Sequence, residues 1–150
     1  MSLYFASTRG DGTTQIWKIA YPGGSPVQLT SSGGTGPTES ADGFVYFTRA
    51  MGSDEIWKVP SQGGAETLVM KGNGLSCWCD WTLAANGIYF VSRSPTRSLA
   101  YYDFKTRTVT KLLDAANHIF NPSISPGGKT LVYGQTDLVD QTIVVVNNFH

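Results

Sequence analysis

The stretch IWKIAYPGGSPVQLT at residues 16–30 returns as IWKVPSQGGAETLVM at residues 56–70, 40 residues further along the chain. Each copy has an apolar, aromatic run, then a Gly-Gly pair at residues 23–24 or 63–64, then a second short apolar run. Glycine accepts the positive φ angles of tight turns, so each copy predicts two antiparallel strands joined by a turn. The repetition indicates either a doubled site or a doubled packing unit.

A longer period contains this duplication. Apolar runs begin at Leu3 (LYFAS), Val45 (VYFT), Ile88 (IYFVS) and Leu131 (LVYGQ), in steps of 42, 43 and 43 residues. A regular period of about 40 to 45 residues with several short strands per unit indicates the blades of a β-propeller. Because each blade must offer its neighbour a similar surface, the repeated stretch is better explained as a packing unit than as a doubled site.

Turn residues place the strands within each unit. The pairs Asp42-Gly43, Asn86-Gly87 and Gly127-Gly128 precede three of the apolar runs and predict tight turns. We name the strands of a blade A to D in chain order. The first unit is expected to supply strands B to D at 3–7, 15–20 and 26–30, and the second to supply all four at 37–41, 44–48, 55–59 and 65–70. The third is expected to supply four at 76–84, 87–92, 98–103 and 108–113, and the last to supply A to C at 120–125, 130–135 and 142–147.

The predicted fold class is therefore all-β, with about three and a half four-stranded antiparallel blades and essentially no helix. We expect a single partial propeller domain whose units span about 3–34, 35–73, 74–116 and 117–150. The composition agrees, because 17 glycines and 7 prolines accompany many β-branched and aromatic residues. Eleven basic and eleven acidic residues cancel, which argues against a nucleic-acid partner. No apolar run reaches the roughly 18 residues of a membrane span.

The repeats also resemble a known family. The segments NPSISPGGKTLVYGQ, GPTESADGFVYFTR, IWKIAYPGGSPVQLT and IWKVPSQGGAETLV are similar to the β-propeller repeats of TolB and its relatives. The ending SPGGKTLVYGQTDLVDQTIVVVNNFH is similar to the last blade of bacterial proteins in which a winged-helix or kinase module precedes such a propeller. The third unit departs from the pattern, since SCWCDWTLA replaces a proline-led strand A. The resemblance implies an extracytoplasmic, periplasmic location.

Partial blades leave open strand edges, which invite pairing with another chain. We expect the chain to be the C-terminal part of a longer protein, and we expect its copies to form a homo-oligomer, most simply a dimer, through the open blade edges. The alternative is that the missing blades of the longer protein meet these edges. A protein or peptide is the other expected partner, and neither nucleic acid nor a membrane is expected.

Cys77 and Cys79 flank Trp78, and two readings exist. Two thiolates can ligate a metal, but zinc sites want four ligands, and the histidines, His118 and His150, stand far off in sequence. In a strand, residues i and i+2 point to one face, so the favoured reading is two small apolar side chains packing between blades.

Five residues are candidates for ligand binding on the loop face or in the channel: Arg9, Arg49, Arg93, Trp78 and His118. The three arginines each follow strand B and would together suit an anion, although tying the adjoining loop by hydrogen bonds is the favoured alternative. The tryptophans of the repeated stretch, Trp17 and Trp57, are predicted to pack between blades. Trp78 and Trp81 are expected on opposite faces of an inner strand, where one of them would line the channel.

No catalytic motif is present. The sequence contains no G-x-S-x-G elbow, no H-E-x-x-H and no phosphate loop, and His118 has no companion for a triad. The loop aspartates Asp11, Asp54, Asp137 and Asp140 lie outside any calcium-loop pattern, so no cofactor or metal is expected. The sequence predicts a non-catalytic propeller that binds a protein or ligand, or serves as a scaffold. The alternative is an accessory segment of a larger enzyme or signalling regulator, such as a kinase, peptidase or winged-helix protein.

Overall fold

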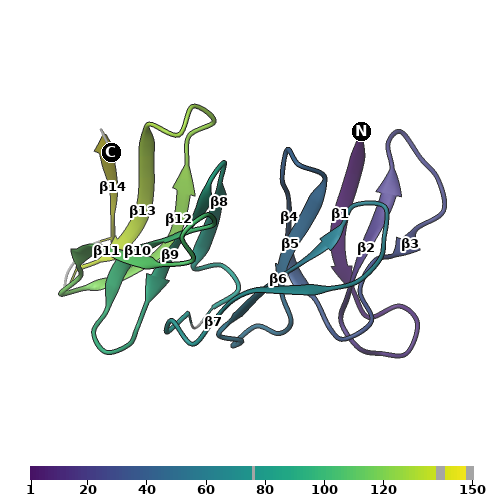
Figure 1. Cartoon of the computed structure of the whole chain (residues 1–150), viewed down its shortest axis with the longest axis horizontal. Helices are drawn as coiled ribbons and strands as arrows, with labels where there is room; N and C mark the ends of the chain where they lie inside the picture. The colour runs from purple at the N-terminus through teal and green to yellow at the C-terminus, as the bar shows by residue number, and fades with distance from the viewer. Residues whose placement is uncertain (76, 138–140, 148–150) are drawn as a thin grey trace. The chain divides into compact units, whose positions relative to one another are not determined.

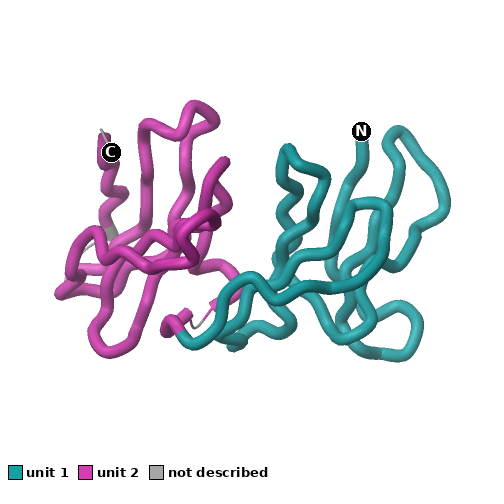
Figure 2. Tube along the Cα trace, in the orientation of Figure 1, with its two compact units in different colours: residues 1–72 teal, residues 73–150 magenta. Residues whose placement is uncertain are grey.

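The computed structural model describes residues 1–75, 77–137 and 141–147, and its strands form four separate antiparallel sheets (Figure 1). The chain divides into two compact units, residues 1–72 and 73–150, with two sheets in each (Figure 2). In the part of the chain that is described, no helix has the length and apolar character to cross a membrane. The all-β expectation is confirmed.

The first unit contains a three-stranded and a four-stranded sheet. The three-stranded sheet has the order β1 (Ser2–Ser7), β2 (Gln15–Ala20), β3 (Val27–Gln28). The four-stranded sheet has the order β4 (Thr35–Glu39), β5 (Phe44–Thr48), β6 (Glu55–Pro60), β7 (Thr67–Lys71). Neighbours in each sheet are consecutive in the chain, so both sheets are antiparallel meanders.

The second unit repeats this design. Its four-stranded sheet consists of β8 (Trp81–Ala84), β9 (Gly87–Ser92), β10 (Ser98–Asp103) and β11 (Val109–Asp114), again neighbours in chain order. Its three-stranded sheet consists of β12 (His118–Ile124), β13 (Thr130–Thr136) and β14 (Gln141–Asn147). The predicted strands therefore correspond to observed ones, mostly within two residues at each end.

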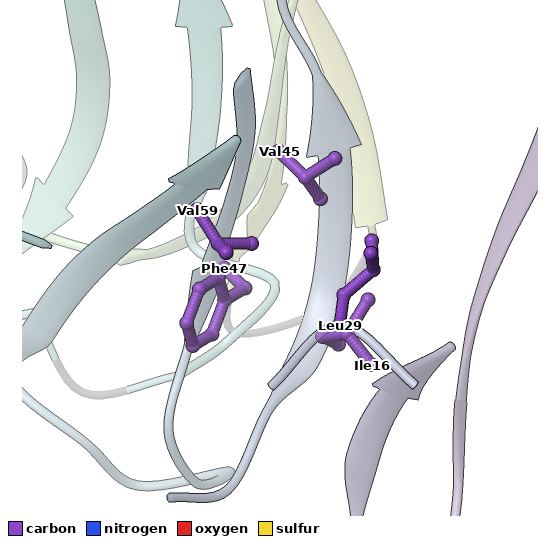
Figure 3. Packing of buried hydrophobic residues seen from close by; sticks show 5 residues of the cluster. All are labelled: Ile16, Leu29, Val45, Phe47 and Val59. Atoms are coloured by element: carbon purple, nitrogen blue, oxygen red, sulfur yellow. The ribbon is translucent and has the colours of Figure 1, made fainter. Parts of the chain in front are cut away.

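The core of the first unit lies between its two sheets. Ile16 and Leu29 come from the first sheet and the residue following it, whereas Val45, Phe47 and Val59 come from the second (Figure 3). Val45 and Phe47 are two apart on β5 and share one face, as the period of a strand requires. The second strands of the repeated stretches, β3 and β7, pair with β2 and β6 as predicted.

The core of the second unit is built in the same way. Val91 and Leu99 of one sheet pack with Ile119, Leu131 and Tyr133 of the other. The apolar faces of both sheets are thus buried against each other. Burial of one such aliphatic side chain contributes about 1.5–3 kcal/mol.

One predicted strand is wrong in its first half. Residues 76–84 were expected to form strand A of the third unit, but β8 covers only Trp81–Ala84. Residues 77–80 form a turn instead, closed by a hydrogen bond from the Asp80 N–H to the Cys77 carbonyl at 3.1 Å. Trp78 therefore lies in a turn. Ser76, Asp140 and His150 lie outside the described residues.

Replacement of a buried isoleucine should destabilise the second unit, whereas the same change on its surface should not. Ile119 is 0% exposed in the core, and Ile143 on β14 is 78% exposed. We expect Ile119→Ala to lower the free energy of unfolding by about 2–5 kcal/mol, because it leaves a cavity. Ile143→Ala should stay within about 0.5 kcal/mol of the wild type at a protein concentration too low for copies to associate. Urea denaturation followed by circular dichroism measures both, and similar losses in the two variants would contradict this core.

Candidate functional site

The turn at Cys77–Asp80 lies directly before β8, the first strand of the third sheet. Leu75 bridges Ser92, and the regular ladder begins with Trp81 opposite Phe90. The described residues between these two pairings, 77–80, lie opposite the single residue Val91, whose N–H donates to the Asp80 carbonyl at 2.8 Å. The extra residues leave the sheet as a turn, and a β-turn brings its first and fourth residues, Cys77 and Asp80, close together.

Asp80 is the buried centre of this region. Only 1% of its side chain is exposed, and its Oδ2 accepts a hydrogen bond from Nη2 of Arg93 at 3.2 Å, while 40% of the Arg93 side chain is exposed. The backbone N–H of Asn121 also donates to the Asp80 carboxylate. Burial raises the pKa of Asp80, and the opposing effects of Arg93, the Asn121 N–H and the charge of His118 do not cancel that increase.

The Asn121 N–H is available because β12 carries a bulge. Phe120 pairs with Gly134 and Ser123 with Val132, so Asn121 and Pro122 together stand opposite one residue. Asn121 adopts a φ of 50°, a left-handed conformation that asparagine tolerates better than most residues. The bulge takes the Asn121 N–H out of the β-ladder, and the amide then serves the carboxylate of the neighbouring sheet.

The two cysteines lie beside this carboxylate. The Sγ atoms of Cys77 and Cys79 and a carboxylate oxygen of Asp80 all lie within 4.8 Å of one another. Both thiols are free and half-buried. Burial raises the pKa of Cys79 to about 12, with smaller contributions from its hydrogen bond with Cys77 and the negative charge of Asp80. The prediction that the two side chains share the face of a strand is wrong, because residues 77–80 form a turn and β8 begins only at Trp81.

Three of the five predicted site residues belong to the region of Asp80. Trp78 is a central residue of the turn and is 38% exposed. Arg93 forms the ion pair. His118 is the first residue of β12, is exposed, and acts electrostatically on Asp80. Asp80 itself was not among the predicted residues, although its place between Cys79 and Trp81, in the unit that lacks the usual proline, could have indicated it.

The other two predicted residues, Arg9 and Arg49, belong to the first unit and contact tryptophans. The guanidinium of Arg49 lies 3.7 Å from the centre of the Trp57 ring, and its Nη1 lies 2.9 Å from both Oε2 of Glu66 and the Ser32 carbonyl. These contacts tie the loop after β5 to its surroundings. The gathering of an anion by all three arginines stays a prediction.

Arg9 also stacks on aromatic rings, at longer distances than Arg49 does. Its guanidinium lies 4.9 Å from the Phe5 ring and 5.4 Å from the Trp17 ring, and its Nε is 3.3 Å from the Ser7 hydroxyl. Trp17 and Trp57 occupy equivalent positions, since each pairs with the equivalent phenylalanine of the preceding strand, Phe5 or Phe47. In the third sheet the equivalent position, opposite Phe90, is occupied by Ala100 and not by tryptophan. Arg93 of that sheet forms an ion pair with Asp80.

Comparison with solved structures identifies the architecture. The chain is similar to TolB from Acinetobacter baumannii, with a TM-score of 0.74 and 21% identity over 97% of this chain and 38% of that one. A protein assigned as TolB from Agrobacterium tumefaciens gives a TM-score of 0.77 and 19% identity over 97% of this chain and 57% of that one. The fold is that of a TolB-like β-propeller. The four sheets are blades of this propeller fold.

The TolB-like fold extends to other proteins. The tricorn protease gives a TM-score of 0.63 and 15% identity, over 95% of this chain and 16% of that chain. No protein-family model and no curated protein sequence matches the chain. The chain spans 57% and 38% of the lengths of the two TolB structures, and identities this low establish the fold alone.

The equivalent arginines of the TolB-like blades should differ in their effect on stability. Arg49 is paired with Glu66, whose side chain is only 10% exposed, so Arg49→Ala leaves a largely buried carboxylate without its cation. We expect a loss of about 2 kcal/mol in the free energy of unfolding. Arg9→Ala removes an exposed stacking contact and should cost less than about 1 kcal/mol. Chemical denaturation of both variants checks the difference, and equal losses would contradict a structural role specific to Arg49.

Proposed function

We propose that this TolB-like propeller segment is a non-catalytic binding module, with Trp78, Arg93 and His118 contacting a protein or peptide partner. The observation that carries the proposal is the position of these three residues at Asp80: Arg93 pairs with its carboxylate, His118 acts on it electrostatically, and Trp78 lies two residues before it in the same turn. The resemblance to TolB-like propellers supports an extracytoplasmic location for the module.

The chemistry of the three side chains favours an acidic and aromatic segment of a partner. Tryptophan and arginine are enriched among the residues that contribute most to binding at protein interfaces. The partly exposed guanidinium of Arg93 is held by Asp80 through Nη2, and this contact orients it before a ligand arrives. Its fork of donors suits a carboxylate.

A non-catalytic role agrees with the state of the cysteines. The nucleophile in cysteine chemistry is the thiolate, and a pKa raised to about 12 keeps the Cys79 thiol protonated at neutral pH while no metal ion is bound to it. The Asp80 carboxylate is buried and already paired with Arg93, so its position agrees with a structural role in holding that arginine.

A peptide-display experiment tests the binding role. We expect the immobilised chain to select peptides with acidic and aromatic residues from a random library, and calorimetry with a selected peptide should give a measurable affinity. Arg93→Gln and Trp78→Ala should each weaken this affinity at least about tenfold, or about 1.4 kcal/mol. Arg107→Gln is the matched control, because Arg107 is exposed at the opposite end of β10. Selection unchanged by Arg93→Gln and Trp78→Ala would contradict the proposal.

The second candidate function is an accessory segment of a larger enzyme or signalling regulator. It is favoured by the similarity to the tricorn protease, of which the chain matches 16%. The gene sequence upstream of Leu3 decides this alternative, because a peptidase, kinase or winged-helix domain encoded there would assign the propeller an accessory role.

We also propose that copies of the chain associate through an open blade edge. In the described residues, β14 pairs only with β13, so its other edge is open. Its side chains alternate, since Val144 and Val146 pack on the core, whereas Ile143 and Val145 are exposed. Unpaired strand edges that carry apolar side chains favour pairing with another strand, and the occupant proposed is a second copy.

Light scattering tests the association. We expect the mass of a dimer at high micromolar concentration, and the double substitution Ile143→Lys with Val145→Lys should return the monomer because charges on an edge strand oppose pairing. Met51→Lys is the control, since Met51 is equally exposed but lies in a loop. A wild-type monomer at high micromolar concentration would rule the dimer out.

A further inference from the structure

The turn at Cys77–Asp80 assembles three metal-binding side chains from four consecutive residues. We infer that Cys77, Cys79 and Asp80 form a binding site for a thiophilic divalent cation of the zinc class. This inference goes beyond the proposed function, because it does not depend on any peptide or protein partner.

The distances suit such an ion. The two sulfur atoms and the carboxylate oxygen lie within 4.8 Å of one another. Zinc–sulfur bonds of about 2.3 Å and zinc–oxygen bonds of about 2.0 Å in a tetrahedral arrangement place ligand atoms roughly 3.5–3.8 Å apart. The donors therefore need to approach by at most about 1.3 Å, a movement that rotation of partly exposed cysteine side chains in a turn supplies.

The donor set selects the class of metal. Thiolate ligands favour zinc and other thiophilic ions, whereas magnesium and calcium require oxygen ligands throughout. Three protein ligands are fewer than the four of a closed structural zinc site, so the fourth position is left to water or to an external ligand. Binding replaces the protons of the two thiols, so each bound divalent ion releases two protons to solvent.

The neighbours of Asp80 provide the outer support that metal ligands commonly have. Arg93 donates to Oδ2 and the Asn121 N–H donates to the same carboxylate, so the group is fixed in orientation. The turn itself is anchored at its end, because the Val91 N–H donates to the Asp80 carbonyl. The preceding segment is anchored by the hydrogen bond from the Arg93 N–H to the Gly74 carbonyl at 3.0 Å.

The test is titration of the full chain with cobalt(II) under a non-thiol reductant, followed by displacement with zinc(II). We expect one cobalt per chain, with a sulfur-to-cobalt charge-transfer band in the near ultraviolet and the intense visible bands of four-coordinate cobalt. Zinc should abolish both signals. Cys77→Ser and Cys79→Ser should each remove most of the charge-transfer band and weaken binding at least about tenfold.

Carboxylate variants complete the test. Asp80→Asn should also weaken cobalt binding, whereas Asp114→Asn should leave it unchanged, because Asp114 is an exposed carboxylate of the same unit that pairs with Lys111. Circular dichroism verifies the fold of each variant, and the cysteine variants decide the question if Asp80→Asn does not fold. Absence of binding to the reduced chain would overturn the inference. Equal binding by the Cys77→Ser/Cys79→Ser double variant would also overturn it.

Discussion

Sheets of three or four short strands bury too little apolar surface to be stable alone in water, so each must cover one face with another sheet. Both units of this chain meet that constraint with two sheets packed around one shared core. Phe47 and Ile119 are fully buried because each is placed against side chains from the other sheet of its unit. The repeated sequence follows from this constraint, since equivalent sheets need equivalent apolar faces.

The first strand of several sheets departs locally from regular pairing. In β4 and β12 two residues stand opposite one, with Gly36 and Asn121 in left-handed conformations. In the third sheet the interruption is longer and becomes the turn at Cys77–Asp80. Such interruptions release backbone and side-chain polar groups from the ladder. One released amide, that of Asn121, then serves the buried carboxylate of Asp80.

Sequence reasoning was reliable wherever short-range patterns decide the structure. Apolar alternation and turn pairs such as Asp42-Gly43 predict strands, because side-chain period and positive φ are local properties; Gly43 has a φ of 82°. The strand predicted at residues 76–84 was wrong because Cys77 and Trp78 are compatible with either a strand or a turn. The choice depends on how many residues fit opposite Val91, which is a property of the partner strand.

The residues of the candidate site likewise include some that could be predicted from local sequence and one that could not. Trp78, Arg93 and His118 could be selected from residue type and position in the repeat, but their common neighbour Asp80 could not, because its importance comes from burial between strands distant in sequence. The period, the strand order and the places of the turns can be inferred from the residues alone, since they follow from local backbone preferences. The partners of the arginines cannot: Arg49 contacts Trp57 and Glu66 whereas Arg93 contacts Asp80, because each guanidinium takes the partners that sheet packing brings within reach.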